Sequence, residues 1–382
     1  MEKISILYFI PELGTGGTER LVFDLCRLLD SSAFTPSVCT FKGGSYVERL
    51  RDFGVKVHLL TDETAHSTSK SVMQKIGQFR ARVALLDETI KNNGIDLVHS
   101  HHFGPLLHMA YGRGRKQRFW LHTEHIRPDI ENAGSRYLPL TGWAYRFPDL
   151  VSGVSREVVS YYTENIGVIR ERTRLVLNGV DVKAFAKQGD SSAKRHELGF
   201  SSEDFLVGIM ANLRPQKNHQ NAIIALSLIY ENYPGLKLVL AGDGSCRPEL
   251  ERLVRDNSLE GRVHFLGHRP DAEELMEVFD VYCLPSLYEG MPLSIMEAWS
   301  AGKPVVATNV LGIRELVQDG VNGVLVQTDD PVALGEGLKR VIADKDFRTM
   351  IAANGKAFAH SECSIERMVE KYENLYREAV LT

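Results

Sequence analysis

Short apolar runs rich in β-branched residues alternate with helical patterns along the first half of the chain. The runs are residues 4–10, 37–41, 55–60, 96–100 and 118–124. Between them, segments such as 70–92 repeat their apolar residues at helical spacing, as do Leu21, Leu25 and Leu28 after the first run. Strands that alternate with helices indicate a parallel sheet covered on both faces.

The second half repeats this alternation after a polar stretch. Residues 181–203 contain glycine and serine among charged residues, which favours a domain boundary there. The apolar runs that follow are 205–210, 236–242, 262–267, 281–285, 304–308 and 323–327. We therefore predict an α/β fold of two doubly wound, Rossmann-like domains, 1–185 and 186–360, facing across a cleft. A last helix within 361–382 has an apolar stripe, and we expect it to pack on the N-terminal domain.

The composition indicates the class of protein and the cellular compartment. Apolar residues make up 43% and charged residues 25% of the 382 positions, enough apolar material for two cores. No run of about 18 apolar residues occurs, and the N-terminal apolar stretch has no small-residue cleavage site. The five cysteines are scattered without a C-x-x-C pair, so we expect a cytoplasmic protein. At a net charge of −4 we expect no nucleic-acid partner.

The strongest chemical signal is the segment 289–297, which follows the run 281–285 and opens a helix. Its candidate ligand-binding residues are Glu289, Gly290, Met291, Pro292, Leu293 and Glu297. Free N–H groups at a helix N-terminus form an anion site suited to a diphosphate, and Glu297 can accept hydrogen bonds from a ribose diol. The alternative is that Glu289 is a solvated loop residue and Glu297 an ordinary acid in the first turn of a helix.

Two cations, Arg214 and Lys217, follow the run 205–210 directly. Fixed positive charge beyond a strand end can neutralise a leaving diphosphate, and such charge is a large catalytic contribution. A solvated basic pair is the alternative, although helix starts normally favour acids.

A glycine-rich segment, 14–17, follows the first run, and Gly16 and Gly17 would let the backbone approach a phosphate closely. A dinucleotide site needs G-x-G-x-x-G, but the sixth position here is Glu19. The pattern therefore disfavours an NAD site.

Histidines follow two neighbouring runs: His99, His101, His102, His122 and His125. No carboxylate or cysteine accompanies them at ligand spacing, so we favour one histidine that binds a sugar hydroxyl over a metal site. The D-x-D sequence at 344–346 starts a helix and is interpreted as solvated. We expect no metal ion and no cofactor.

The chain resembles a family 4 glycosyltransferase of the GT-B fold over nearly its whole length. The motifs that carry the resemblance are 16–19, 123–125, 151–155, 178–181, 213–217, 240–244, 263–267, 289–297, 302–307, Gly312 with Glu315, and 319–323. Their order and spacing together are highly specific.

The resemblance implies a role for each candidate residue. Lys217 would bind the donor diphosphate with Gly17 nearby, and Glu297 would bind the ribose. Glu289 and the backbone after it would face the donor sugar, with His125 beside that sugar. The base would lie near His268 and Arg269. The family usually has arginine where this chain has Asn212, and we expect Arg214 to substitute for it.

The resemblance also implies the reaction: transfer of a sugar from UDP or GDP to an acceptor hydroxyl, with retention of the anomeric configuration. A glycan or a lipid-linked acceptor is the expected partner. Two alternatives stay open, a nucleotide-sugar epimerase or hydrolase on the same fold and a non-catalytic nucleotide-sugar-binding scaffold.

Basic residues in the first half suggest an anionic membrane as a further partner. The segment 113–118 contains Arg113, Arg115, Lys116 and Arg118. The segment 70–92 combines lysine and arginine with an apolar stripe, a pattern that suits peripheral docking on a bilayer. The alternative is that the stripe packs on the sheet of the first domain.

Overall fold

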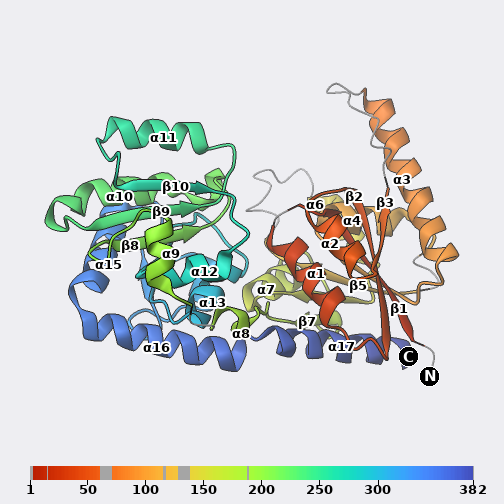
Figure 1. Cartoon of the computed structure of the whole chain (residues 1–382). Helices are drawn as coiled ribbons and strands as arrows, with labels where there is room; N and C mark the ends of the chain where they lie inside the picture. Colours follow the sequence, from red (N-terminus) through yellow and green to blue (C-terminus); the bar gives the residue numbers. More distant parts are fainter. Residues whose placement is uncertain are drawn as a thin grey trace. The chain divides into compact units, whose positions relative to one another are not determined.

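The computed structural model describes residues 3–14, 16–60, 71–114, 118–127, 138–186 and 189–381. They divide into two compact units. The N-terminal unit consists of Met1–Asn178 with Glu366–Thr382, and the C-terminal unit of Gly179–Ile365 (Figure 1). Each unit is an α/β structure of its own, and each is described separately below.

A parallel sheet lies at the centre of the N-terminal unit. Its described strands, in spatial order, are β3 (Lys56–Leu59), β2 (Phe34–Lys42), β1 (Ile4–Glu12), β4 (Leu97–His101), β5 (Phe119–Glu124), β6 (Leu150–Gly153) and β7 (Thr173–Leu175). The described helices are α1 (Gly17–Leu28), α2 (Tyr46–Asp52), α3 (Val72–Asn92), α4 (Phe103–Tyr111), α6 (Leu138–Ala144), α7 (Arg156–Glu164), the turn η3 (Arg170–Arg172) and α17 (Ile365–Leu381). Each predicted run of this half overlaps a strand, while β6 and β7 lie outside the predicted set.

The C-terminal unit has the same architecture. Its described strands, in spatial order, are β10 (Val263–Gly267), β9 (Leu236–Ala241), β8 (Phe205–Met210), β11 (Val281–Leu284), β12 (Val305–Thr308) and β13 (Val324–Val326), again all parallel. Its described helices and turns are α8 (Val182–Phe185), α9 (Ser191–Glu197), η4 (Pro215–Lys217), α10 (His219–Ile229), η5 (Tyr230–Asn232), α11 (Arg247–Asp256), α12 (Ala272–Val278), α13 (Leu293–Ser300), α14 (Leu311–Arg314), α15 (Pro331–Ala343) and α16 (Lys345–Glu362). The prediction of two doubly wound α/β domains is confirmed for each unit.

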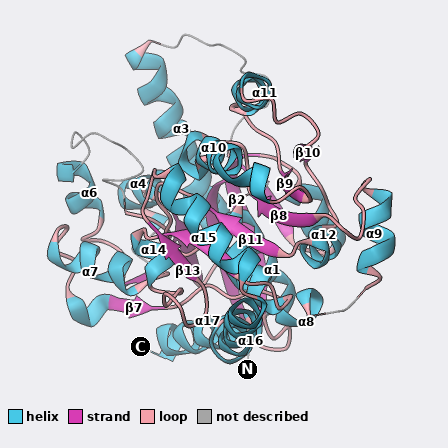
Figure 2. Cartoon of the chain, turned by 90° about the vertical axis from the view of Figure 1, so that its left-hand side faces the viewer, coloured by secondary structure: helices cyan, strands magenta, loops and turns pink. Residues whose placement is uncertain are grey.

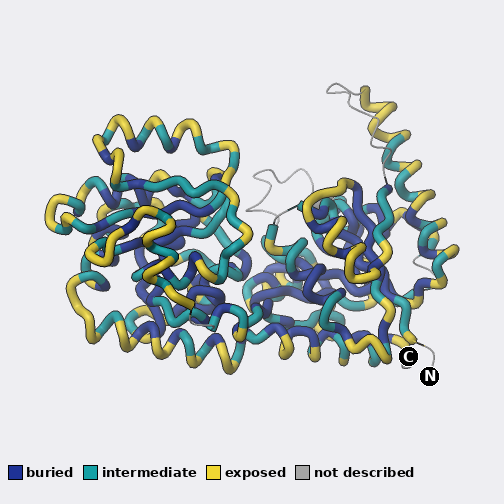
Figure 3. Tube along the Cα trace, in the orientation of Figure 1, coloured by how far each residue is buried: buried dark blue, intermediate teal, exposed yellow. Residues whose placement is uncertain are grey.

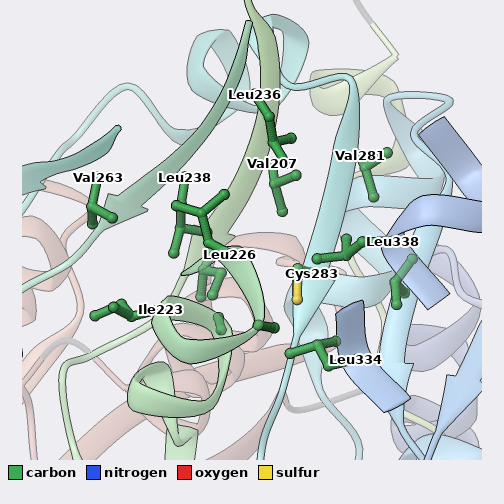
Figure 4. Packing of buried hydrophobic residues seen from close by; sticks show 14 of the residues in the cluster. Val207, Ile223, Leu226, Leu236, Leu238, Val263, Val281, Cys283, Leu334 and Leu338 are labelled. Carbon is green, nitrogen blue, oxygen red and sulfur yellow. The ribbon is translucent and has the colours of Figure 1, made fainter. Parts of the chain in front are cut away.

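Apolar side chains from strands and covering helices form a core in each unit. In the C-terminal unit, Val207 and Val281 on adjacent strands pack with Leu226 of α10 and Leu334 of α15 (Figure 4). Helices lie around the strands, as Figure 2 shows. Strands buried on both faces must be apolar throughout, which is why the runs were visible in the sequence.

The helix α17 belongs to the N-terminal unit. Its predicted stripe is buried, and the Tyr376 hydroxyl lies 2.7 Å from Nδ1 of His99 on β4. The predicted domain boundaries, 185/186 and 360/361, differ from those of the structure. Val180 pairs in parallel with Ser364, and α8 packs on α13, so residues 179–185 belong to the C-terminal unit. The polar stretch after 181 lies inside that unit instead of linking the two.

The helix α3 has two different halves. Ser71 and Gln74 form a capping box at its start, which fixes the first turn. Leu86 and Ile90 in the second half are buried, whereas Val72, Met73 and Ile76 are exposed (Figure 3). The predicted helix is therefore present, and it packs on the domain from Phe79 onward, where the Phe79 ring lies 4.4 Å from that of His108. Lys70 lies outside the described residues.

The order of strands reverses once in each sheet. In the N-terminal unit the reversal lies between β1 and β4, and in the C-terminal unit between β8 and β11. The loops that leave these adjacent strands turn in opposite directions, which opens a crevice at their carboxyl ends where ligands of such sheets bind. These two places are where the candidate residues must be sought.

Candidate active site

In the C-terminal unit, the loops after β8 and β11 are joined to each other. The backbone N–H of Leu287 donates to the carbonyl of Gln216 at 2.8 Å, and the Gln216 side-chain amide donates to the carbonyl of Tyr288 at 3.0 Å. These bonds fix the end of η4 beside the start of the 289–297 segment. Two motifs far apart in sequence are therefore neighbours at the strand-order reversal.

Lys217 and Glu289 form an ion pair at this place. The Lys217 ammonium lies 2.5 Å from Oε1 of Glu289, and the Ser286 hydroxyl donates to the same oxygen at 2.6 Å. The Glu289 side chain is 7% exposed and that of Lys217 is 21% exposed. The carboxylate is thus held by two donors, and the cation remains accessible to a further anion.

Glu297 lies one turn inside α13, which begins at Leu293. Pro292 is the N-cap residue and, within the described part of the chain, no side chain caps this helix. Glu297 is buried, and its charge adds to burial in raising the pKa of Tyr282. The first turn of α13, four residues after Glu289 in sequence, accordingly keeps backbone donors that no side chain caps, as an anion site requires.

The backbone at Glu289 and Gly290 is braced by Gly312 of α14. A Cβ atom at Gly312 would lie 2.1 Å from the Gly290 carbonyl oxygen and 2.4 Å from that of Glu289. Such distances exclude any side chain, so glycine is required for the loop to keep its place. Gly312 belongs to the motifs but was not among the predicted site residues.

The predicted base-binding residues and the second predicted cation differ in their surroundings. His268 is exposed after β10, and the Arg269 guanidinium donates to Asp271 through Nε at 2.8 Å and through Nη2 at 2.5 Å. The hydrogen bond from Arg269 holds the pKa of Asp271 well below its usual range. Arg214 is exposed and is the N-cap residue of η4, where its carbonyl accepts from the backbone N–H of Lys217 at 3.0 Å. Arg269 is thus engaged by Asp271, while Arg214 is open to solvent.

In the N-terminal unit, the reversal brings the glycine segment and two histidines together. Gly16 is the N-cap residue of α1 and Gly17 its first residue, while Thr15 lies outside the described residues. The Thr18 hydroxyl lies 2.8 Å from Nε2 of His102, which directly follows β4. The ring of His102 lies beside that of His125, with centroids 5.0 Å apart.

His125 follows β5 and is held from a second side by His101. Nδ1 of His101 lies 3.0 Å from Nε2 of His125, and burial lowers the pKa of both rings well below the ordinary value. Both rings are therefore neutral at pH 7, and His125 is suited to hydrogen bonding rather than to acting as a cation.

The remaining histidines of the two strands are part of the interior. His99 bonds Tyr376 and Thr123, and His122 lies 2.7 Å from Glu124. Within the ranges that the structure covers, no three His, Cys, Asp or Glu side chains are grouped so that they could hold a metal ion. His102 and Thr18 were not predicted as site residues; the histidine cluster was the signal that could have pointed to His102.

Comparison with known proteins covers both halves of the chain. Residues 15–184 match the family described as Glycosyltransferase Family 4, and residues 190–358 match the family described as Glycosyl transferases group 1. The N-acetyl-alpha-D-glucosaminyl L-malate synthase of Bacillus anthracis is 26% identical over 302 residues, which cover 78% of each protein. The UDP-Gal:alpha-D-GlcNAc-diphosphoundecaprenol alpha-1,3-galactosyltransferase of Escherichia coli is 33% identical over 213 residues, which cover 54% of each protein.

Solved structures give the same picture. HepE of Anabaena, in complex with UDP-glucose, is 25% identical with a TM-score of 0.86, and the match covers 98% of this chain and 100% of HepE. WaaG, a glycosyltransferase of lipopolysaccharide biosynthesis, is 16% identical with a TM-score of 0.78 and shares the fold.

Proposed function

Because the chain belongs to the family 4 glycosyltransferases, with a group 1 domain in its C-terminal half, we propose that it transfers a hexose from a UDP-hexose to an acceptor hydroxyl with retention of the anomeric configuration. The observation that carries this proposal is the Lys217–Glu289 pair, whose carboxylate belongs to the segment that leads into the uncapped start of α13. The UDP-glucose bound to HepE and the UDP-Gal in the name of the Escherichia coli relative support UDP as the nucleotide.

In this proposal the donor diphosphate binds Lys217 and the backbone amides of the first turn of α13. Glu297 accepts hydrogen bonds from the ribose, and Glu289 faces the sugar. During transfer, the bond between the anomeric carbon and the phosphate oxygen breaks, and the acceptor oxygen bonds to the same carbon. The acceptor proton passes to the departing phosphate, so atoms and charge balance.

Positive charge at the leaving group is supplied by the protein. Lys217 and the α13 dipole can stabilise the negative charge that develops on the diphosphate. We therefore propose that turnover needs no metal ion and survives excess EDTA. Loss of activity in EDTA, with recovery on adding Mg²⁺ or Mn²⁺, would contradict this part of the proposal.

Nucleotide release from a panel of UDP- and GDP-sugars, with and without glycan and lipid-linked acceptors, tests the function. We expect release from a UDP-hexose that accelerates with acceptor, and an approximately 100-fold or larger loss in Lys217→Ala. Lys339→Ala is the matched control, because Lys339 pairs with Glu336 on the exposed side of α15. Acceptor-independent conversion of the sugar would favour the epimerase or hydrolase, and binding without turnover would favour the scaffold.

We also propose that the N-terminal unit docks on anionic bilayers through the first half of α3. Val72, Met73 and Ile76 are exposed there beside Lys75. Apolar side chains can enter the headgroup region while the cation contacts lipid charge. Of the basic segment 113–118, residues 115–117 lie outside the described part of the chain. Within that part, none of the helices combines the length and apolar character that crossing a bilayer requires.

Vesicle co-sedimentation tests the docking. Binding should require anionic lipid, weaken with added salt, and fall in Met73→Ser. Val332→Ser is the matched control, since Val332 is an exposed apolar residue on α15 of the other unit. Equal recovery with neutral and anionic vesicles would contradict the electrostatic part of the docking.

A further inference from the structure

His102 has a backbone conformation that side chains rarely adopt. Its φ is 63° and its ψ is 162°. This region of φ/ψ space is essentially restricted to glycine. Asn218 also has positive φ, but its ψ of 44° places it in the left-handed helical region that asparagine tolerates. His102 is therefore strained in a way that Asn218 is not.

The strained residue lies at the strand-order reversal of the N-terminal unit. It follows β4 and is the N-cap residue of α4, yet its side chain makes no capping hydrogen bond. Its ring instead reaches Thr18 in the first turn of α1 and lies against His125 after β5. The side chain thus connects the segments that follow the neighbouring strands β1, β4 and β5.

The fold alone does not require a histidine here. Glycine would adopt the same backbone angles without strain, and α4 would lose no capping bond. What glycine would remove is the contact of the ring with Thr18 and with His125. Strain of this kind persists at functional sites because the geometry that it imposes is used there.

We propose that His102 is a positioning residue that holds the first turn of α1 and the ring of His125 in the arrangement required for sugar transfer. This rests on the proposed function, in which the diphosphate is bound by residues of the C-terminal unit, and on the position of His125 beside the sugar that the family resemblance implies. Loss of the His102 ring should therefore lower kcat while the KM for the donor stays nearly constant.

The test compares His102→Gly and His102→Asn with the wild type in the full-length enzyme. In His102→Gly we expect kcat to fall roughly 10- to 100-fold, the effect of a misplacement of about 1 Å. The donor KM should change by less than about twofold, because the proposed diphosphate ligands, Lys217 and the first turn of α13, belong to the C-terminal unit and His102 to the N-terminal unit. The urea midpoint should stay equal or rise, because strain is relieved. An asparagine side chain tolerates positive φ and can hydrogen-bond, so His102→Asn should recover part of kcat.

Two further variants separate positioning from general damage. Thr18→Val should lower kcat in the wild type and have no added effect in His102→Gly, because both changes break the same contact. Ser258→Gly is the matched control: Ser258 has φ of 54° in the turn after α11, so glycine should relieve strain there without changing kcat.

Hydrogen–deuterium exchange provides a readout that does not depend on activity. The amides of residues 20–23, which donate the first hydrogen bonds of α1, should exchange faster in His102→Gly, while the sheet keeps its protection. Normal kcat in His102→Gly, or unchanged exchange at residues 20–23, would overturn the proposal. If the wild type turns over no nucleotide sugar, the proposed function fails, and the exchange result still decides whether His102 orders α1.

Discussion

The ion pair between Lys217 and Glu289 predicts that neutralising Glu289 has opposite effects on UDP affinity and on turnover. Glu289→Gln keeps the size of the side chain but removes its charge. Lys217 then loses its intramolecular partner, and the anion site next to it loses a negative charge. UDP should consequently bind more tightly to Glu289→Gln than to the wild type, although turnover falls.

The size of the affinity gain follows from the geometry. Lys217 Nζ lies 2.5 Å from Oε1 of Glu289, so a phosphate oxygen on the far side of the ammonium would lie roughly 6 Å from the carboxylate. Two unit charges at about 6 Å repel by about 1.4 kcal/mol at an effective dielectric of ~40, an intermediate value for a half-exposed site. Salt reduces this to about 1 kcal/mol, which corresponds to an approximately fivefold lower Kd for UDP.

Calorimetric titration with UDP and steady-state turnover with the donor measure the two effects. We expect about fivefold tighter UDP binding and roughly 100-fold slower turnover in Glu289→Gln. Ser286→Ala is the control, because it removes the other hydrogen bond to Glu289 and leaves the charge. UDP binding that is unchanged or weaker in Glu289→Gln would refute the idea that the carboxylate competes with the diphosphate for Lys217.

Three other predictions follow from the described contacts. Gly312→Ala should lower turnover about 100-fold, because a methyl group would displace the 289–290 backbone; normal turnover would contradict this. Burial lowers the pKa of His108 and of His219 from 6.5 to about 4. Between pH 6.5 and about pH 4 the unfolded state therefore binds more protons than the folded state, so the free energy of unfolding should decrease as the pH falls through this range. At pH 5.5 each histidine should cost about 1.4 kcal/mol relative to pH 7.5, measured by urea unfolding, and His219→Leu should remove its share. Arg214→Ala should weaken donor binding about tenfold and Asn212→Ala should do little, as one lost charge-assisted hydrogen bond implies; the reverse order of severity would assign the phosphate role to position 212.

The strands were predictable because parallel sheets that are covered on both faces require continuous apolar runs. Val207 and Val281 belong to such runs, and both lie in the core of the C-terminal unit. The short strands β6 and β7 have four and three residues, too few for a pattern to stand out. The predicted boundary after 185 differs from the division after Asn178 because the polar stretch 181–203 contains the short helices α8 and α9 of the C-terminal unit.

The candidate site was predictable in its residue types but not in its pairings. Lys217 and Glu289 are 72 positions apart in sequence, and only the order of the strands makes them neighbours. The contact of His102 with Thr18 depends in the same way on β1 and β4 being adjacent. Backbone angles such as those of His102 leave no trace in a hydrophobic pattern, so the strain could be found only in the structure.

Each proposed site contains an energetically unfavourable feature that the apolar cores lack. Near β4 this feature is a histidine in a glycine conformation, and near β11 it is a carboxylate that pairs with Lys217, the cation that we propose binds the diphosphate. A substitution that removes such a feature should therefore improve one property and impair another. His102→Gly should preserve or raise stability, and Glu289→Gln should raise UDP affinity. Both substitutions should slow sugar transfer. A side chain that served folding alone would show no such opposition, since its loss would lower stability and activity together. A fall in turnover that accompanies a gain in stability or in UDP affinity thus distinguishes a residue that acts in transfer from a residue that acts in packing.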